Sequence, residues 1–207
     1  MYARSNTLMG APEQMDEGIA YIRDEVMPLV MGLDGNVGLS MLCDRESGRC
    51  IVTSAWQSEE AMRASDAAIR ESRSRATDVF GSAAPEVREW EIAMMHRAHE
   101  GHDGACARVI WSEGDPARAE DRLSTFRMAM LPRIEELPGF CSLSLLVDRQ
   151  TGHSAMTVTY DSREDMERAA EAGRAMREEF TSSQNTRVTD MADFDVVLHH
   201  LRVPELA

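Results

Sequence analysis

The sequence predicts an α+β protein that contains two copies of one unit of about a hundred residues. Three observations support this prediction: an internal repeat without gaps, hydrophobic spacing that switches between strand and helix periods, and turn residues at matching positions. Each copy has the element order β-α-β-β-α-β, a recurrent supersecondary arrangement.

The repeat consists of short matching segments at a constant offset. Residues 33–35 align with residues 137–139, an offset of 104 residues, and the same offset places Pro28 on Pro132. It also places residues 10–12 on 114–116 and residues 44–48 on 148–152. About a quarter of the aligned positions are identical, so the chain is a tandem duplication.

Each copy is predicted to open with a strand and a helix. Short strands over residues 4–8 and 108–112 end at Gly-x-Pro turns. In the following segment, apolar residues recur at the spacing of one helical face, and we expect them to be buried. They are Met15, Ile19, Ile22 and Val26, with Ala119, Leu123, Phe126 and Met130 in the second copy.

A β-hairpin is predicted next in each copy. Its first strand shows alternating apolar side chains, typical of a half-buried strand. These are Val37, Leu39, Met41 and Cys43, with Cys141, Leu143, Leu145 and Val147 in the second copy. Gly48 and Gly152 lie in the turns, where a left-handed backbone is expected, and the returning strands cover residues 51–56 and 155–160.

A second helix and a last strand complete each copy. Ser58 and Ser162 are predicted N-caps, because acidic residues follow them in the first helical turn. The last strands carry Trp90, Ile92 and Met94, or Phe194, Val196 and Leu198, on one face.

The domain organisation follows from these elements. The helices of such a unit cover one face of its sheet, so the other face needs a second copy to bury it. We predict two ferredoxin-like halves, residues 1–96 and 105–207, joined by a linker over residues 97–104 and forming an α+β barrel within one chain. The chain is then an intramolecular pseudo-dimer, and further dimerisation through the outer helices stays open.

Charge and composition narrow the partners. The chain has 36 acidic and 22 basic residues and a formal net charge of -14, which disfavours nucleic acid and anionic membranes as partners. No apolar run approaches the roughly 20 residues that cross a bilayer, and no signal-peptide pattern opens the chain, so we expect a cytoplasmic protein. The cysteines are predicted to be buried thiols. A disulfide between Cys43 and Cys50, which flank a hairpin turn, is the alternative.

Several of these motifs carry a resemblance to a known family. The Gly-x-Pro turn, the Leu-Pro-Gly-Phe of residues 137–140 and the strand end and helix start over residues 51–61 resemble the antibiotic-biosynthesis-monooxygenase-like family of dimeric α+β barrels. The resemblance covers nearly the whole chain, once per half, and implies a pocket between sheet and helices in each half. The family includes cofactor-free oxygenases of aromatic polyketides and haem-degrading enzymes, so it indicates the fold better than the chemistry.

The resemblance also bears on cofactors. Haem-degrading members carry a pocket asparagine on the first strand, which Asn6 matches, and a tryptophan and an iron-ligating histidine on the second helix. Ser65 and Arg75 occupy these two positions in the first half, and Ala169 and Glu179 occupy them in the second. We therefore expect no cofactor and no metal, with haem as the alternative.

The first half contains the candidate catalytic residues Asn6 and Trp56 and the candidate substrate-binding residue Arg4. Arg4 and Asn6 share one face of the first strand, and Trp56 lies on a neighbouring strand. A carboxamide beside an indole can orient a phenolate or enolate oxygen, as cofactor-free oxygenation requires. The alternative is that Trp56 closes the core and Asn6 satisfies a strand end.

The second half contains two further candidate substrate-binding residues, Trp111 and Tyr160. Ile110 stands in place of Asn6 and cannot orient an oxygen, although Arg108 is retained. We therefore expect a drier pocket in the second half and the working pocket in the first.

Three polar sets have both a functional and a structural interpretation. The arginine pairs are either an anion clamp or a solvated helix face, and the carboxylates are either acid/base groups or part of an exposed edge strand. The histidines suit a metal, but the predicted linker gives them no positioned carboxylate or cysteine. The sets are Arg70 and Arg73 with Arg174 and Arg177; Glu89 and Glu91 with Asp193 and Asp195; and His96, His99 and His102.

The sequence thus predicts a cofactor-independent monooxygenase that acts on a small aromatic or polyketide-like molecule. The alternative is a non-catalytic protein that binds a small molecule, haem included, on the same scaffold. Oxygen uptake with candidate phenols distinguishes the two.

Overall fold

The computed structural model describes residues 1–206 and contains the predicted α+β barrel. Hydrogen bonds connect its strands in the order β1-β3-β2-β8-β5-β7-β6-β4, and this order closes on itself. Within residues 1–206, the helices are all too short or too polar to span a membrane.

The chain divides into two compact units. The N-terminal unit comprises Met1–Trp90 and Asp195–Val203, and the C-terminal unit comprises Glu91–Phe194 with the residues from Pro204 onward. Each unit thus contains β-α-β-β-α from one repeat, and the last strand of each repeat begins in one unit and ends in the other.

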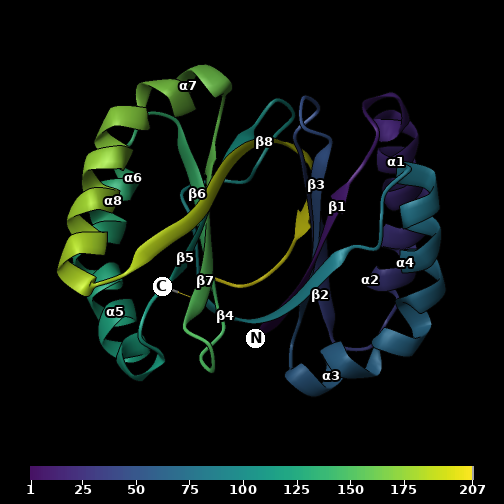
Figure 1. Ribbon diagram of the computed structural model, residues 1–207, viewed down its shortest axis with the longest axis horizontal. Coiled ribbons are helices and arrows are strands. Elements are labelled where there is room, and N and C mark those ends of the chain that lie inside the picture. The colour runs from purple at the N-terminus through teal and green to yellow at the C-terminus, as the bar shows by residue number, and fades with distance from the viewer. Residues whose placement is uncertain (207) are drawn as a thin grey trace. The chain divides into compact units, whose positions relative to one another are not determined.

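In the N-terminal unit, helices form a layer on one face of the sheet that contains β1, β3 and β2 (Figure 1). Its elements are β1 (Tyr2–Met9), α1 (Met15–Tyr21), α2 (Met27–Met31), β2 (Asn36–Cys43), β3 (Arg49–Trp56), α3 (Glu59–Ala64), α4 (Asp66–Phe80) and the start of β4 (Glu86–Arg97). The end of β8 pairs antiparallel with β2, so that Met41 lies opposite Leu198.

The C-terminal unit repeats this layering with α5 to α8 on its own sheet. Its elements are β5 (Cys106–Glu113), α5 (Ala119–Thr125), α6 (Leu131–Glu135), β6 (Phe140–Val147), β7 (His153–Tyr160), α7 (Arg163–Arg168), α8 (Ala170–Gln184) and the start of β8 (Arg187–Leu201). The end of β4 pairs antiparallel with β6. Both opening strands extend beyond the predicted ranges at each end.

The hairpin turns need glycine for two reasons. Gly48 and Gly152 have φ values of 77° and 78°, which confirms the predicted left-handed backbone. A Cβ at Gly48 would also lie 2.1 Å from the carbonyl oxygen of Gly10, and a Cβ at Gly152 would lie 1.9 Å from that of Gly114. The repeated Gly-x-Pro turn and the hairpin turn therefore touch, and any side chain would separate them.

The first helix of each repeat contains a π-helical segment that the sequence did not predict. The segments are η2 (Ile22–Val26) and η4 (Phe126–Met130), at equivalent positions of the two repeats. Pro28 and Pro132 follow each segment by two residues. Proline has no N–H to donate and its ring crowds the carbonyl four residues earlier, so a wider turn relieves the clash.

The predicted helical faces are largely confirmed. Ile22, Val26, Leu123, Phe126 and Met130 are buried, as is Met15. The prediction was wrong for Ile19 and Ala119, which are only half-buried.

The predicted caps and thiols are present. The Ser58 and Ser162 hydroxyls accept hydrogen bonds from the N–H groups of Ala61 and Asp165. All four cysteines are buried and free. Cys43 and Cys50 are direct cross-strand partners of β2 and β3, and the hydrogen bond between them, together with burial, raises the pKa of Cys43.

Candidate functional site

Each unit has a cavity between its sheet and its helices. The cavity of the N-terminal unit measures about 50 Å³, and that of the C-terminal unit about 120 Å³. A water molecule needs roughly 10 to 15 Å³ on this measure, and an engineered apolar cavity of about 150 Å³ binds benzene. The first cavity is therefore sized for water, whereas the second approaches the size of an aromatic ring.

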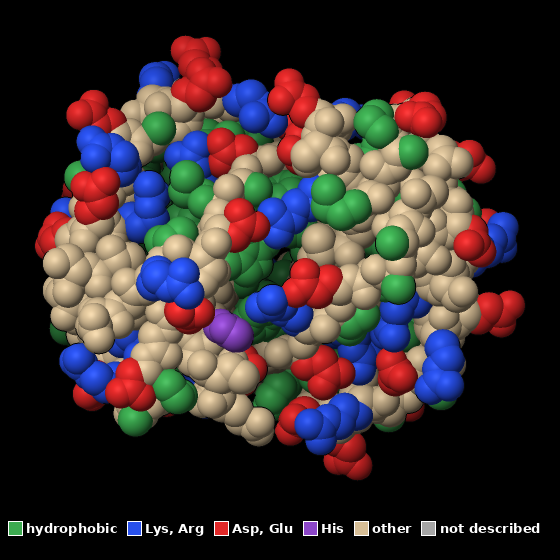
Figure 2. Space-filling view, viewed as in Figure 1, with side chains coloured by type: hydrophobic (Ala, Val, Ile, Leu, Met, Phe, Trp, Pro, Cys, Tyr) green, Lys and Arg blue, Asp and Glu red, His purple; other side chains and the backbone are tan. Residues whose placement is uncertain are grey.

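The C-terminal cavity has an apolar wall and a polar border. Its apolar lining includes Ile110, Leu123, Phe126, Met130, Ile134, Leu145, Met156, Val158, Met176 and Phe180. Its polar lining includes Arg108, Arg122, Ser112, His153, Ser154, Tyr160 and Arg177. On the viewed face, hydrophobic side chains come to the surface between the helices and strands of this unit, and basic side chains border them (Figure 2).

Gly173 is one reason why this cavity is larger. It lies on α8 and lines the cavity, and a Cβ added there would have no neighbour within 4 Å. Ile69, which lines the small cavity and is 7% exposed, is its counterpart in the first repeat. Glycine inside a helix costs about 1 kcal/mol relative to alanine, so the protein gives up helix stability here and gains open space.

A second reason lies at the other end of the helices. In the N-terminal unit, Phe80 is fully buried, and a Cβ on Gly18 would lie only 2.4 Å from its ring. Arg122 and Gln184 occupy these two positions in the second repeat, and the cavity extends to Arg122. The Gln184 Oε1 is buried and has no hydrogen-bond partner within residues 1–206.

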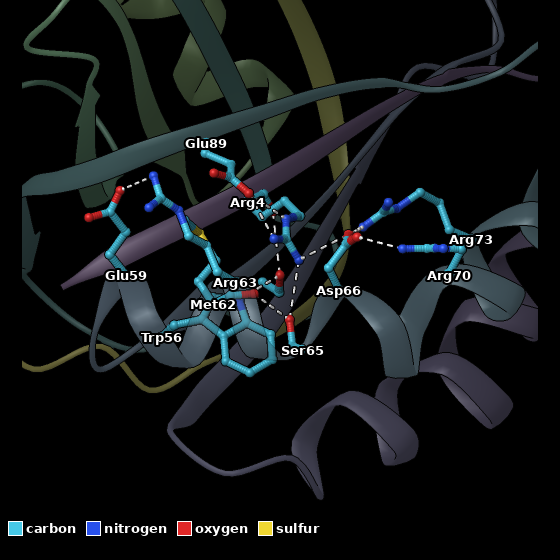
Figure 3. Close-up of polar contacts among 11 residues, drawn as sticks. Arg4, Trp56, Glu59, Met62, Arg63, Ser65, Asp66, Arg70, Arg73 and Glu89 are labelled. Carbon is cyan, nitrogen blue, oxygen red and sulfur yellow. Dashed lines mark hydrogen bonds and ion pairs between the residues drawn. The ribbon is translucent and has the colours of Figure 1, made fainter.

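Near the small cavity, arginine side chains are paired with acidic side chains (Figure 3). Arg4 is 2% exposed and donates to Glu89 at 2.7 and 3.2 Å and to the Ser65 hydroxyl at 3.2 Å. The Asp66 carboxylate accepts a hydrogen bond from Arg73 at 3.1 Å, and this bond is the main reason why the pKa of Asp66 is low. The arginines of this half are therefore neutralised.

The same positions in the C-terminal unit lack one of these acids. Arg108 keeps a bidentate pair with Asp193, with both distances at 2.7 Å. Ala170 replaces Asp66, and Arg177, the counterpart of Arg73, forms no ion pair within residues 1–206. Burial, with the neighbouring Arg108 as a smaller cause, lowers the pKa of Arg177. An uncompensated guanidinium thus lies at the border of an apolar cavity.

Two further polar groups of the cavity are shaped by burial. Burial raises the pKa of Tyr160 to about 12, and the charge of Arg108 opposes the rise. Tyr160 is therefore neutral at pH 7 and able to donate a hydrogen bond. Burial also lowers the pKa of Arg122, whose guanidinium donates to the carbonyl of Asp115.

Of the three site residues predicted in the first half, one lines the small cavity and two do not. Asn6 lines the small cavity, and its Oδ1 is buried without a partner within residues 1–206. Trp56 does not line it: the indole is 0% exposed in the core and donates to the Ser54 hydroxyl at 3.0 Å. Arg4 is likewise held in its ion pair with Glu89 rather than at the cavity.

In the second half, Tyr160 lines the cavity and Trp111 does not. Trp111 is half-buried and packs edge-on against Phe194, with ring centroids 6.5 Å apart. The sequence placed the candidate pocket in the first half, whereas cavity size and the unpaired cation favour the second. Comparing the repeats would have indicated this, because Asp66 becomes Ala170 and Ile69 becomes Gly173.

The residues present do not fit haem. Arg75 and Glu179, at the positions of the expected iron ligand, form exposed ion pairs with Glu25 and Arg133. Neither residue lines either of these two cavities, and about 120 Å³ does not accommodate a porphyrin.

Fold and site together define an α+β barrel protein with a ligand-sized cavity between sheet and helices in its C-terminal unit. No family model matches the chain. Two Mycobacterium tuberculosis proteins, the uncharacterized Rv2557 and Rv2558, are each 44% identical to it over its whole length, which corresponds to 92% and 87% of their own lengths. The chain belongs to the family of Rv2557 and Rv2558.

Solved structures with this fold include antibiotic-biosynthesis-monooxygenase-like proteins. An anthrone oxidase-like protein has a TM-score of 0.65 at 14% identity, with 94% of this chain and 90% of that chain covered. A ferredoxin-fold protein related to antibiotic biosynthesis monooxygenases, from Listeria monocytogenes, has a TM-score of 0.53 at 9% identity, with 94% of both chains covered. A haem-degrading enzyme of the same organism has a TM-score of 0.50 at 11% identity, covering 94% of this chain and 99% of that one.

Proposed function

We propose that the protein binds a small aromatic or polyketide-like molecule with one acidic oxygen in the cavity of its C-terminal unit. The observation that carries the proposal is Arg177, a partly buried guanidinium at the border of an apolar cavity that forms no ion pair with any other residue from 1 to 206. Burying a charge without a partner is costly, and a ligand anion would supply the missing partner.

The cavity also limits what the ligand is. An apolar wall around about 120 Å³ favours one enclosed ring, with any further part of the molecule extending toward the opening. The acidic oxygen, either a carboxylate or an ionised phenol or enol, would accept from Arg177, and neutral Tyr160 would add a second donor.

The test compares benzoate with benzamide, which has nearly the same shape without the charge. A charge-assisted hydrogen bond contributes about 1.5 to 3 kcal/mol. In a calorimetric titration, benzoate should therefore bind at least roughly 10-fold more tightly than benzamide. Arg177→Gln should remove most of this preference, whereas Arg73→Gln, at the equivalent place of the first repeat, should leave it unchanged. Equal affinities for both ligands would reject the anion as the recognised group.

A sharper variant restores the missing acid. Ala170→Asp recreates the Asp66–Arg73 arrangement of the first half and should neutralise Arg177 without altering it. Benzoate affinity should fall toward that of benzamide, and benzamide affinity should stay the same. If neither ligand binds the folded wild-type protein, the cavity itself is not a ligand site for single-ring molecules.

Cofactor-independent monooxygenation is the second candidate. Arg177 supplies positive charge beside Tyr160, whereas the charge of Arg108 is offset by Asp193, and positive charge stabilises the enolate that reacts with oxygen. The likeness in fold to an anthrone oxidase-like protein suggests the substrate type. Oxidation of an anthrone converts its CH₂ to C=O, and the second oxygen atom leaves as water with those two hydrogens, so no external reductant is needed.

Oxygen consumption with anthrone, measured in chelator-treated buffer, tests this candidate. The wild-type protein should consume oxygen above the rate of heat-denatured protein, and Arg177→Gln should lower the rate by roughly 10-fold or more. No consumption above the denatured control would leave ligand binding as the function.

A further inference from the structure

The loop that follows β4 holds two histidines against one carboxylate. The Nε2 atoms of His99 and His102 lie 3.3 and 3.2 Å from the same Oδ1 atom of Asp161. The Cys141 thiol joins two of these residues, because its sulfur, the Asp161 oxygen and the His99 nitrogen all lie within 4.8 Å of one another, and His102 approaches this trio through its contact with Asp161. The sequence had shown these histidines without any positioned cysteine or carboxylate, and the fold supplies both.

Hydrogen bonds fix how the two imidazoles are oriented. The Nδ1 of His99 lies 3.1 Å from the carbonyl oxygen of Glu100, and the Nδ1 of His102 lies 2.9 Å from that of Asp103. A carbonyl only accepts, so each Nδ1 carries the hydrogen and each Nε2 of a neutral ring presents a lone pair. With neutral rings, two lone pairs therefore face a carboxylate oxygen, an arrangement that either a proton or a metal ion between them stabilises. Metal-bound histidines commonly show this outer hydrogen bond to a carbonyl.

We propose that His99, His102, Cys141 and Asp161 form a binding site for a zinc ion. Ligands at roughly 2.0 to 2.1 Å from a tetrahedral zinc ion are about 3.3 Å apart, which matches both observed nitrogen–oxygen distances. Two imidazoles, one thiolate and one carboxylate form a donor set that suits zinc better than magnesium or calcium, which prefer oxygen ligands.

The scaffold divides the site into an inner and an outer part. Cys141 is 1% exposed on β6, and Asp161 directly follows β7, where its N–H donates to the Gly139 carbonyl. The side chains of His99 and His102 are 44% and 50% exposed, so an ion reaches the site from solvent. The N–H of Ala98 donates to the Cys141 carbonyl at 2.9 Å, which holds the loop against β6.

A zinc ion here would fasten the connection between the two repeats to the sheet of the C-terminal unit. The four protein ligands leave no position for a substrate, so the role is structural. The first repeat has no second copy of the site, since Val37 and Gln57 stand in place of Cys141 and Asp161.

The test titrates zinc and cobalt ions into the full-length protein after treatment with a chelator and dialysis. One zinc ion should bind per chain. Cobalt should give the visible spectrum of a tetrahedral site with a thiolate-to-metal charge-transfer band, and Cys141→Ser should abolish that band. His99→Gln and His102→Gln should each weaken zinc binding roughly 10-fold or more, whereas His200→Gln, an exposed histidine on β8, should have no effect.

Two outcomes would overturn the proposal. One is that the His99→Gln and His102→Gln proteins bind zinc as tightly as the His200→Gln control does. The other is cobalt binding without a thiolate band. Because Cys141 is buried, its variant is checked by circular dichroism, and the exposed histidine variants keep the test decisive if that variant does not fold. Zinc should also raise the Tm of the wild type and leave that of the His99→Gln/His102→Gln protein unchanged.

Discussion

The cavities between sheet and helices occupy equivalent places in the two repeats, yet of these two, within residues 1–206, the C-terminal one alone approaches the size of an aromatic ring and borders a guanidinium without an ion pair. In the first repeat, Ile69 and Phe80 fill the space and Asp66 neutralises Arg73. In the second repeat these three side chains are replaced by Gly173, Gln184 and Ala170. The difference shows that one copy of a duplicated unit can open a ligand site by losing bulky and acidic side chains.

Losing these groups has a stability cost that a ligand can offset. A helix glycine costs about 1 kcal/mol relative to alanine, and a buried polar atom without a partner, such as Gln184 Oε1, about 1 to 3 kcal/mol. A ligand that binds only the folded protein stabilises it by about 2.7 kcal/mol at a hundred times its Kd. The C-terminal unit therefore suits a protein that works with its cavity filled.

The largest effect on stability is expected from truncating a buried side chain on the helical face that lines each cavity. Phe126→Ala and Ile22→Ala should each lower the free energy of unfolding by about 2 to 5 kcal/mol, since both side chains are buried. Phe126 should cost more, because it also loses its edge-to-face contact with Phe180 at 5.5 Å. Urea denaturation measures both values. A loss of less than about 0.5 kcal/mol at both sites would contradict the packing described.

A smaller but more specific effect is expected from closing the C-terminal cavity. Gly173→Ile introduces the side chain that Ile69 provides in the first repeat and should weaken benzoate binding at least about 100-fold, or 2.7 kcal/mol. Gly173→Ala adds only a methyl group into open space and serves as the control for helix propensity. Undiminished benzoate binding by a folded Gly173→Ile protein would place the ligand elsewhere.

The smallest expected effect concerns the acid that only the first half retains. The pKa of Asp66 is lowered, chiefly by the hydrogen bond from Arg73, so its contribution to stability is present above the pKa of the unfolded chain, about 3.9. It is lost as the pH falls through the lower folded pKa. Thermal melts of wild type and Asp66→Asn should therefore differ at pH 7, and the difference should shrink steadily as the pH falls below about 3.9. A difference that persists or grows in acid would contradict the assigned pair.

Features with local causes were predictable from the sequence. The glycines of the hairpin turns and the serine caps act on neighbouring backbone groups, and their roles are confirmed at Gly48, Gly152, Ser58 and Ser162. The π-helical segments were missed, although Pro28 and Pro132 mark them. A proline interrupts a helix in several ways, and sequence alone does not distinguish a widened turn from a kink.

Features that depend on contacts between distant residues were not predictable in the same way. Asn6 was chosen for its chemistry and lines a cavity, whereas Trp56, chosen for the same reason, lies in the core. Whether a strand side chain lines a cavity or fills it depends on the helix above it, and those helix positions are some sixty residues away in the chain. The sizes of Ile69 and Gly173 decide that question.

The sequence by itself determined the duplication, the element order and the barrel, because hydrophobic period and turn chemistry are local and repeat at a constant offset. The tertiary structure alone decided that the histidines of the loop after β4 meet Cys141 and Asp161. Electrostatic and ligand geometry depend on distances of a few ångströms between residues far apart in the chain, and only the packed fold sets those distances.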